Sequence, residues 1–451
     1  MQSTERRINL EILHRLKRDT ATRNKLLYTV MILFAILIGY RIPLPGINTE
    51  YLKAFFSSIS SSGVGGFINA LTGSSMQTMS IFGLSISPYI SASIILQLLT
   101  VIVPALERMS KDGSVGKQKM ERLTFVIGAL IAIIESLALA IGFGEKGLFV
   151  NYTWYMVLYA TVVWTVGACF LIWVGQTISN RLIGNGISLI LMMNILTTFP
   201  GDMINIFNSF ASGSAWWMQL IVAVVIAIVA CLVFAYVVVL NNAEKRISIT
   251  NSGKSGMRMT GANNNVMPLK LNMGGVMPII FSSSIMSFPT LIAQFCDVKS
   301  GSTAEKIISC FNQGNWFRPD NILPTLGVLA FIPLTFAFSY FYSIISFNTK
   351  DIADNLRKSG SIINGIRPGQ PTADYLNSQA KSMLWLGTSM LIVIALLPTL
   401  ISGLFNISGL SFGGTTIIII VGVILEMKNT LNAQTSSVAY KSLIKKKGGR
   451  K

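Results

Sequence analysis

The amino-acid sequence predicts an all-α polytopic membrane protein, and three observations support this fold class. Of the 451 residues, 51% are hydrophobic and only 12% are charged, and the mean hydropathy is +0.59. Several apolar runs reach the length of about eighteen residues that a transmembrane helix needs. The formal net charge of +18 must then lie outside the lipid, where a basic surface fits an anionic partner such as lipid headgroups, RNA or an acidic protein surface.

The apolar runs predict ten transmembrane helices. Their expected ranges are 24–42, 76–104, 120–143, 153–176, 184–200, 215–240, 269–293, 324–346, 383–402 and 410–428. The first run follows a polar segment rich in Arg and Lys, and no small-residue cleavage site closes it. We therefore expect it to remain as the first span and not to be removed as a signal peptide.

The distribution of Lys and Arg predicts the orientation of these spans. An even number of spans places both termini on one side of the membrane, and that side holds 30 of the 36 Lys and Arg residues. The six on the opposite side are Arg41, Lys53, Lys146, Lys299, Lys306 and Arg318. Because loops rich in Lys and Arg stay in the cytosol, we expect both termini and the large basic loops to be cytosolic.

Ten spans divide into two halves of five that enter the membrane from opposite sides, which fits an inverted repeat. This interpretation is supported by topology alone. We expect a cytosolic amphipathic segment at 1–23, a first half at 24–200, an external hinge loop at 201–214, a second half at 215–428 and a basic cytosolic tail at 429–451. The second half contains two large cytosolic loops, at 241–268 and 347–380.

The sequence offers no visible machinery for catalysis, so we expect no enzyme, no cofactor and no metal. His14 is the single histidine, and paired carboxylates and a phosphate-binding glycine loop are absent from the sequence. Glu135 is the one clear carboxyl within a span, and two interpretations stay open: a group bonded inside the helix bundle, or the proton-coupling residue of a secondary transporter of a small solute. Cys296 and Cys310 share one loop, where a disulfide requires an oxidising space.

Polar and small residues interrupt the second and seventh spans. The second carries Ser91 and Gln97, and the seventh carries Ser282, Ser283 and Ser284. Small residues in one span indicate tight helix packing, but two such spans, one in each half, favour a mobile seam or a wet pathway.

Ile86 and Ile90 are one helical turn apart in the second span and share a narrow apolar face. This face has two readings: ordinary packing, or a hydrophobic constriction that blocks water and ions. The loop after the eighth span contains GIRPG around Arg367, where glycine and proline indicate fixed turns. Retention of a basic loop in the cytosol needs no such turns, so this loop looks shaped for docking.

Six motifs in order resemble the SecY family of protein-conducting channel subunits over nearly the whole chain. They are RIPLPGI (41–47), ISPYISASIILQLLT (86–100), GNGISL (184–189), PLKLNMGGVMPIIFSSSI (268–285), DIADNLRKSG with GIRPG (351–360 and 365–369) and FGGTT (412–416). The resemblance implies two inverted five-helix halves, arranged as a clamshell around a central hourglass pore.

The resemblance also implies a plug, a half-helix after the first span that closes the outer vestibule, and the segment 62–75 stands at its position. The plug residues are Gly63, Val64, Gly65, Gly66, Phe67, Ile68, Asn69, Ala70 and Leu71. Glycine and serine at both ends suit an element of low helix stability that swings aside.

Three further sites follow from the resemblance. The pore ring corresponds to Ile86, Ile90, Leu191, Ile280 and Ile419. The lateral gate, which opens toward lipid, corresponds to the second and seventh spans, with Ser91, Gln97, Ser282, Ser283 and Ser284. The docking surface for a cytosolic partner corresponds to Lys245, Arg246, Lys254, Arg258, Arg357, Lys358 and Arg367.

Partners and location follow in the same way. The resemblance implies small membrane subunits like SecE and SecG, the motor ATPase SecA, ribosomal RNA phosphates, signal sequences, unfolded polypeptides and membrane lipid, at the bacterial cytoplasmic membrane. Two positions depart from the family pattern: Lys245–Arg246 is followed by Ile247 and Ser248 without a proline, and Thr349 stands where the family commonly has proline. Besides the small-solute transporter, a scaffold that gathers a cytosolic partner is a competing hypothesis.

Overall fold

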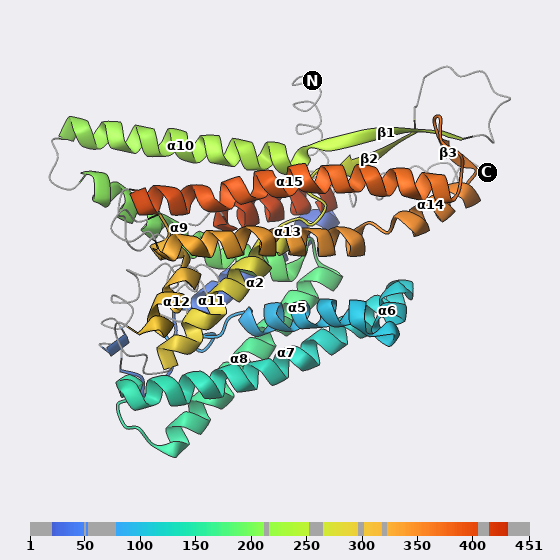
Figure 1. The fold of residues 1–451 in the computed structure, drawn as a ribbon. Coiled ribbons are helices and arrows are strands. Elements are labelled where there is room, and N and C mark those ends of the chain that lie inside the picture. Colours follow the sequence, from blue (N-terminus) through green and yellow to red (C-terminus); the bar gives the residue numbers. More distant parts are fainter. Residues whose placement is uncertain are drawn as a thin grey trace. The chain divides into compact units, whose positions relative to one another are not determined.

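The computed structural model describes residues 20–48, 51–52, 78–211, 216–251, 265–295, 302–317, 323–404 and 415–431. These residues are mostly helical (Figure 1), and each of the ten expected ranges contains a helix. The helices are α2 (Thr20–Gly39), α5 (Ser87–Ile102), α7 (Gly113–Phe143), α8 (Trp154–Arg181), α9 (Gly186–Ala211), α10 (Trp216–Asn242), α11 (Met277–Phe295), α13 (Leu326–Ser346), α15 (Gln370–Leu404) and a helix at 415–431. Cys296, one partner of the possible disulfide with Cys310, lies outside the described residues.

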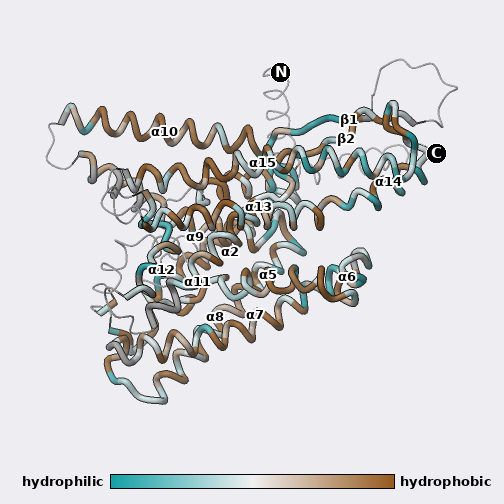
Figure 2. Tube along the Cα trace, in the orientation of Figure 1, coloured by the Kyte–Doolittle hydropathy of each residue, from teal (hydrophilic) through white to brown (hydrophobic). Residues whose placement is uncertain are grey.

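Among the described residues, six helices are long and apolar enough to cross a membrane, or seven when the bent pair of α5 and α6 (Pro104–Lys111) counts as one span. The apolar parts of α9 and α11 are shorter. Figure 2 shows hydrophobic residues along the whole of α10, and β1 (Glu244–Asn251) is hydrophilic.

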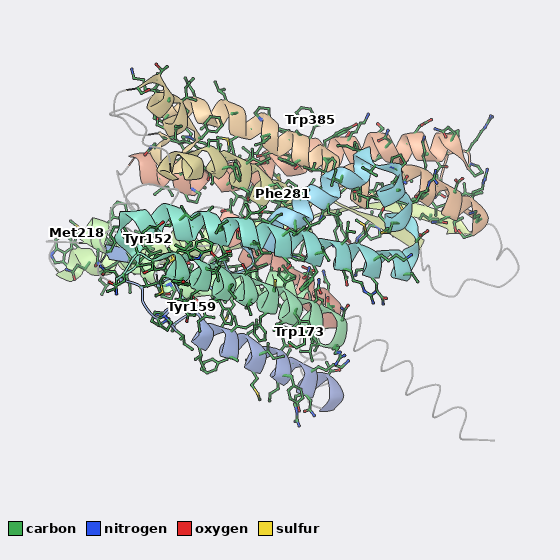
Figure 3. All side chains as sticks on the ribbon, turned by 90° about the horizontal axis from the view of Figure 1, so that it is seen from below. Tyr152, Tyr159, Trp173, Met218, Phe281 and Trp385 are labelled. Carbon is green, nitrogen blue, oxygen red and sulfur yellow. The ribbon has the colours of Figure 1, made fainter. Side chains whose placement is uncertain are left out.

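Large apolar side chains point outward from several of these helices (Figure 3). Tyr159 and Trp173 on α8 and Trp385 on α15 are exposed, whereas Phe281 on α11 is buried. So many exposed aromatic and aliphatic groups are typical of surfaces that face lipid, not water.

The second span differs from the prediction, because its helix begins at Ser87 and not near residue 76. Residues 78–86 form successive turns, with Ser85 N–H donating to the Phe82 carbonyl at 2.8 Å. Pro88 then lies in the first turn of α5, where its missing N–H leaves no hydrogen bond unmade. At the other end, extended Val103 precedes Pro104, and α6 turns away by 109°.

The chain forms two compact units. The first reaches to Ile204 and also takes in the described residues from Val423, and the second runs from Asn205 to Gly422. Because α9 continues through Pro200 to Ala211, residues 201–211 are helical although we expected them in the hinge loop.

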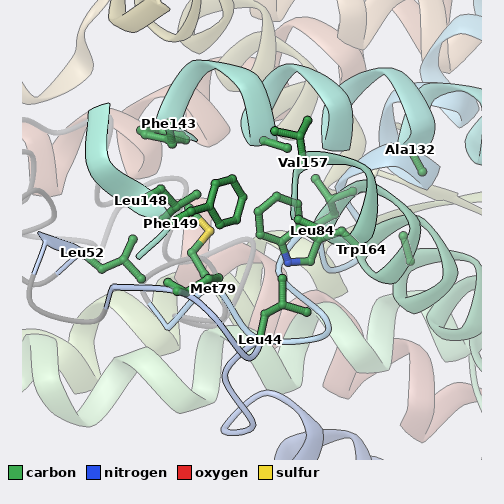
Figure 4. Packing of buried hydrophobic residues seen from close by; sticks show 14 residues of the cluster. Leu44, Leu52, Met79, Leu84, Ala132, Phe143, Leu148, Phe149, Val157 and Trp164 are labelled. Carbon is green, nitrogen blue, oxygen red and sulfur yellow. The ribbon is translucent and has the colours of Figure 1, made fainter. Parts of the chain in front are cut away.

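The first unit has a core that fixes the turns before α5 (Figure 4). Trp164 of α8 packs among Leu44, Met79 and Leu84 and is only 1% exposed. Its indole Nε1–H donates to the Ser80 carbonyl at 3.1 Å. The segment after α2 is tied to the same turns, since the Leu44 N–H donates to the Met79 carbonyl at 3.1 Å.

The second unit contains a small antiparallel sheet that the sequence did not predict. Its strand order is β2-β1-β3, with β2 at Asn265–Lys270 and β3 at Ser361–Ile363. Glu244 pairs with Lys270 in one ladder and Ile249 with Ile363 in the other. The sheet therefore joins the two basic loops, and α14 (Thr349–Lys358) lies between α13 and β3 in the chain.

Candidate functional site

Two pore-ring candidates stand at the start of α5 in the first unit. Ile86 is the residue that caps the helix and is 0% exposed, and Ile90 is 9% exposed. The Ile90 N–H donates to the Ile86 carbonyl at 3.1 Å, so the two side chains leave adjacent turns on one face. This is the arrangement expected from their spacing.

A buried hydrogen bond brings α9 to the same place. Asn194 Nδ2 donates to Ser85 Oγ at 2.8 Å, one residue before Ile86. Leu191 precedes Asn194 by one helical turn and is 6% exposed, so it shares the face of α9 that meets the start of α5. The first unit thus gathers Ile86, Ile90 and Leu191 around this contact.

The second unit gathers the other two candidates through a glycine. A Cβ atom built on Gly422 would lie 2.7 Å from Cγ2 of Val276, so the Val276 side chain packs closely against the Gly422 backbone. Ile419 lies one turn before Gly422, and the Ile280 N–H donates to the Val276 carbonyl at 3.3 Å. Ile280 and Ile419 are each 4% exposed and flank this contact.

Three of the five gate candidates form hydrogen bonds within their own helices. Gln97 Nε2 donates to Ser93 Oγ at 2.9 Å on α5. On α11, Ser282 Oγ donates to the Pro278 carbonyl and Ser284 Oγ to the Ile280 carbonyl, both at 2.8 Å. Hydroxyls that bond back along the helix expose little polar surface.

Two gate candidates have less support from hydrogen bonds. Ser283 Oγ is buried, and it has no hydrogen-bond partner among the described residues. Ser91 is half-buried on α5.

The docking candidates lie on and beside the sheet. Arg246 forms an ion pair with Glu244 at 2.9 Å, Arg357 pairs with Asp354 at 3.6 Å, and Lys245 Nζ donates to Gln379 Oε1. Lys358 is exposed on α14. Lys254 and Arg258 lie outside the described residues.

Arg367 stands out because its backbone is fixed while its side chain is exposed. Gly365 and Gly369 on either side have φ of +82° and +104°, which only glycine adopts without strain. Ile366 packs against a small core around Ile247 and Leu376, and Thr372 Oγ1 donates to the Arg367 carbonyl at 2.8 Å. The loop presents one guanidinium from a defined turn.

The expected plug, 62–75, lies outside the described residues. Glu135 is half-buried on α7. Within the described part of the chain, no group of three or more His, Cys, Asp or Glu residues could hold a metal ion.

The sequence analysis missed the residues that hold the ring candidates in place. In the first unit these are Tyr40 and Asn194, whose side chains hydrogen-bond Ser85 Oγ. In the second unit they are Val276 and Gly422, which contact each other. All four lie in or next to apolar runs. Asn194 did carry a signal, since an isolated amide in an apolar run needs a buried partner.

Comparison with known proteins identifies the family. The SecY family model matches residues 80–428. The protein translocase subunit SecY of Streptomyces galbus is 34% identical over 442 residues, covering 95% of this chain and 98% of that protein. The subunit of the same name from Staphylococcus carnosus is 33% identical over 437 residues, covering 95% and 97%.

Solved structures show the same fold. A protein-conducting channel and a SecY structure that describes how the plug domain stabilises the closed channel each match with a TM-score of 0.64 at 17% identity, covering 93% of this chain and 94% of theirs. Sec61 in the canine ribosome–channel complex of the endoplasmic reticulum matches with a TM-score of 0.61 at 16% identity and the same coverage.

These matches support a multi-pass bacterial membrane protein of the protein-conducting channel type, and they give no support to the small-solute transporter. The family model alone covers more than half of the chain, and the relatives exceed 30% identity over nearly its whole length. The chain belongs to the SecY family.

Proposed function

We propose that this chain forms the channel through which unfolded secretory polypeptides cross the bacterial cytoplasmic membrane. One observation carries the proposal: all five ring candidates are at most 9% exposed, although the helices that carry them also bear large apolar side chains that are exposed. Aliphatic side chains that line a constriction exclude water and ions without any charged group.

The proposal is tested by crosslinking from the ring. A photoreactive residue at position 86 captures a polypeptide stalled halfway through export, whereas the same probe at Ile95 does not. Ile95 is on the same helix but 43% exposed, so it is a matched lipid-facing control. Equal capture from both positions would remove Ile86 from the path of the polypeptide and would end the case for the ring.

The segment 62–75 acts as the plug in this proposal, supported by its composition and by the resemblance. Deletion of residues 63–73 is expected to make an assembled channel leak ions. A deleted channel that stays closed and exports normally would contradict the assignment.

The lateral gate lies along the second and seventh spans, α5 and α11. Opened by a hydrophobic signal sequence, it releases apolar segments sideways into lipid. The intrahelical bonds of Ser282 and Ser284 support this role, because a hydroxyl that bonds back along its own helix exposes little polar surface to a neighbouring segment.

Arg367 is the proposed centre of the docking surface for SecA or the ribosome. Arg367→Glu is expected to abolish motor-driven export and to leave insertion of the channel into the membrane intact. Arg181→Glu is the matched control, since Arg181 is also exposed and expected in the cytosol but lies outside both large loops. Export that tolerates Arg367→Glu would exclude this role.

The remaining expectations belong to the same proposal. Both termini face the cytosol, and small membrane subunits like SecE and SecG complete the channel. A ribosome would meet the basic loops through RNA phosphates, so its binding is expected to weaken with salt. The chain has no enzymatic activity of its own, and energy comes from the partner. Glu135→Gln is therefore expected to leave export intact at every pH.

A further inference from the structure

The backbone immediately before the ring adopts a conformation that serine normally avoids. Ser85 has φ of +51°, in the left-handed region, and it directly precedes Ile86, the cap of α5. For residues other than glycine this region is unfavourable, because Cβ crowds the following carbonyl. Ser85 is 0% exposed, so no contact with water supports it.

Two side chains from distant parts of the first unit hold Ser85 in this conformation. The Tyr40 hydroxyl hydrogen-bonds Ser85 Oγ at 3.1 Å, and Asn194 Nδ2 donates to the same oxygen at 2.8 Å. We call these three residues the Ser85 cluster.

The Ser85 cluster is dry and links three segments. Tyr40 follows α2, Ser85 precedes α5, and Asn194 lies within α9. Tyr40 is 2% exposed and Asn194 is 0% exposed. Hydrogen bonds in such surroundings are strong, and the loss of one partner is costly because no water replaces it.

We propose that Tyr40 and Asn194 are positioning residues for the pore ring: they hold Ser85 in its left-handed conformation and so set the direction in which Ile86 and Ile90 leave the backbone. Since Leu191 lies one turn from Asn194 on α9, the same cluster also fixes the position of Leu191 relative to Ile86 and Ile90. The inference rests on the proposed function, because it assigns the cluster a task only if Ile86 belongs to the ring.

The test separates backbone conformation from the hydroxyl group. Ser85→Ala and Ser85→Gly both remove the hydroxyl, but only glycine adopts positive φ without strain. Relative to glycine, the Cβ atom of alanine lowers the population of the left-handed conformation by about tenfold. Ion conductance of the resting, fully assembled translocase in lipid vesicles is expected to rise severalfold for Ser85→Ala and to rise less for Ser85→Gly.

Two further variants leave Ser85 unchanged and alter the side chains that hydrogen-bond it. Tyr40→Phe keeps the aromatic group of the side chain and removes its hydroxyl. Asn194→Leu replaces the amide with an apolar group of similar size. Each is expected to raise the resting conductance, and the pair together more than either alone. Adding Ser85→Gly to the pair is expected to restore most of the seal, which a merely structural role for these groups would not predict.

Ser136→Ala is the matched control. It removes a partly buried hydrogen bond of the first unit, the 2.9 Å contact between Ser136 Oγ and Thr165 Oγ1, which joins α7 and α8, two helices that carry no ring candidate. Its resting conductance is expected to equal that of the wild type. The amount of each variant in the membrane shows that all of them assemble.

The variant Ile86→Gly distinguishes a failure of the positioning role from a failure of the proposed pore ring. If Ile86→Gly leaks but Ser85→Ala and the Tyr40/Asn194 pair stay sealed, the positioning role is overturned and the ring stands. Equal leaks from Ser85→Ala and Ser85→Gly would show that the hydroxyl and not the backbone matters, and would also overturn it. If Ile86→Gly stays sealed, the ring assignment fails and the inference fails with it.

Discussion

In the first unit, the segments that carry Ile86 and Leu191 meet through the buried hydrogen bonds of the Ser85 cluster, whereas in the second unit the helix that carries Ile419 meets Val276 through Gly422. Both contacts position aliphatic side chains that are candidates for the pore ring. A hydrogen-bonded contact fixes direction but leaves costly groups behind when one partner is lost. A glycine contact depends on close packing and fails when anything larger is introduced.

The largest effect is expected at the glycine contact. Gly422→Leu forces a side chain into space already filled by Cγ2 of Val276, at a cost of about 3 kcal/mol in the free energy of unfolding, the upper end for overpacking. The midpoint of thermal unfolding of the solubilised chain measures the loss.

Gly201→Leu is the control for this variant, because a Cβ atom at Gly201 meets nothing within 4 Å. A sharper version pairs Gly422→Ala with Val276→Ala, which frees the space that the new methyl group needs. If the second substitution recovers none of the stability lost through the first, the contact is not the close approach described here.

A smaller loss is expected from Asn194→Leu in the hydrogen-bonded contact. The variant removes the donor to Ser85 Oγ and leaves the remaining hydroxyls with each other, so we expect a cost of about 2 kcal/mol. The same unfolding measurement checks it. A midpoint unchanged from the wild type would mean that the contact in the first unit, like the contact of Gly422 in the second, depends on packing alone.

Tyr40→Phe is expected to cost about 1 kcal/mol, since the bond between Asn194 and Ser85 survives. Combined with Asn194→Leu, the loss should differ from the sum of the two single losses, because both side chains share one oxygen. Strictly additive losses in this double-mutant cycle would show that the three residues do not act as one cluster.

The smallest effect is expected from Ser136→Ala, at roughly 0.5 kcal/mol, the low end for one hydrogen bond. Ser136 Oγ and Thr165 Oγ1 belong to regular helices whose backbones need no support. A loss as large as that of Asn194→Leu would contradict the distinction between a bond that holds strained backbone and one that does not.

Much of the fold was predictable because its signals are local. Apolar runs long enough to span the membrane gave the helical class, which the comparisons confirm, and each expected range contains a helix. The shared face of Ile86 and Ile90 followed from a spacing of one turn. The family resemblance, which supplied the other ring positions, is confirmed as well.

What the sequence analysis missed depends on contacts between distant residues. Hydropathy extended the second span back to residue 76, because the turns at 78–86 are as apolar as a helix and are held by Trp164 from α8. The loop ranges gave no sign that β1 pairs with both β2 and β3. The fifth span was expected to end at residue 200, yet α9 continues through Pro200, as helices in a membrane can when neighbours satisfy the freed groups.

The ladder between β1 and β3 has a consequence for genetic experiments. Ile249 and Ile363 are adjacent partners in the sheet although more than a hundred positions separate them in the chain. A second-site suppressor in one basic loop that rescues a defect in the other would therefore be acting on its immediate neighbour. Such an allele pair reports local repair of one continuous surface, and no signal passing through the lipid bilayer has to be invoked to explain it.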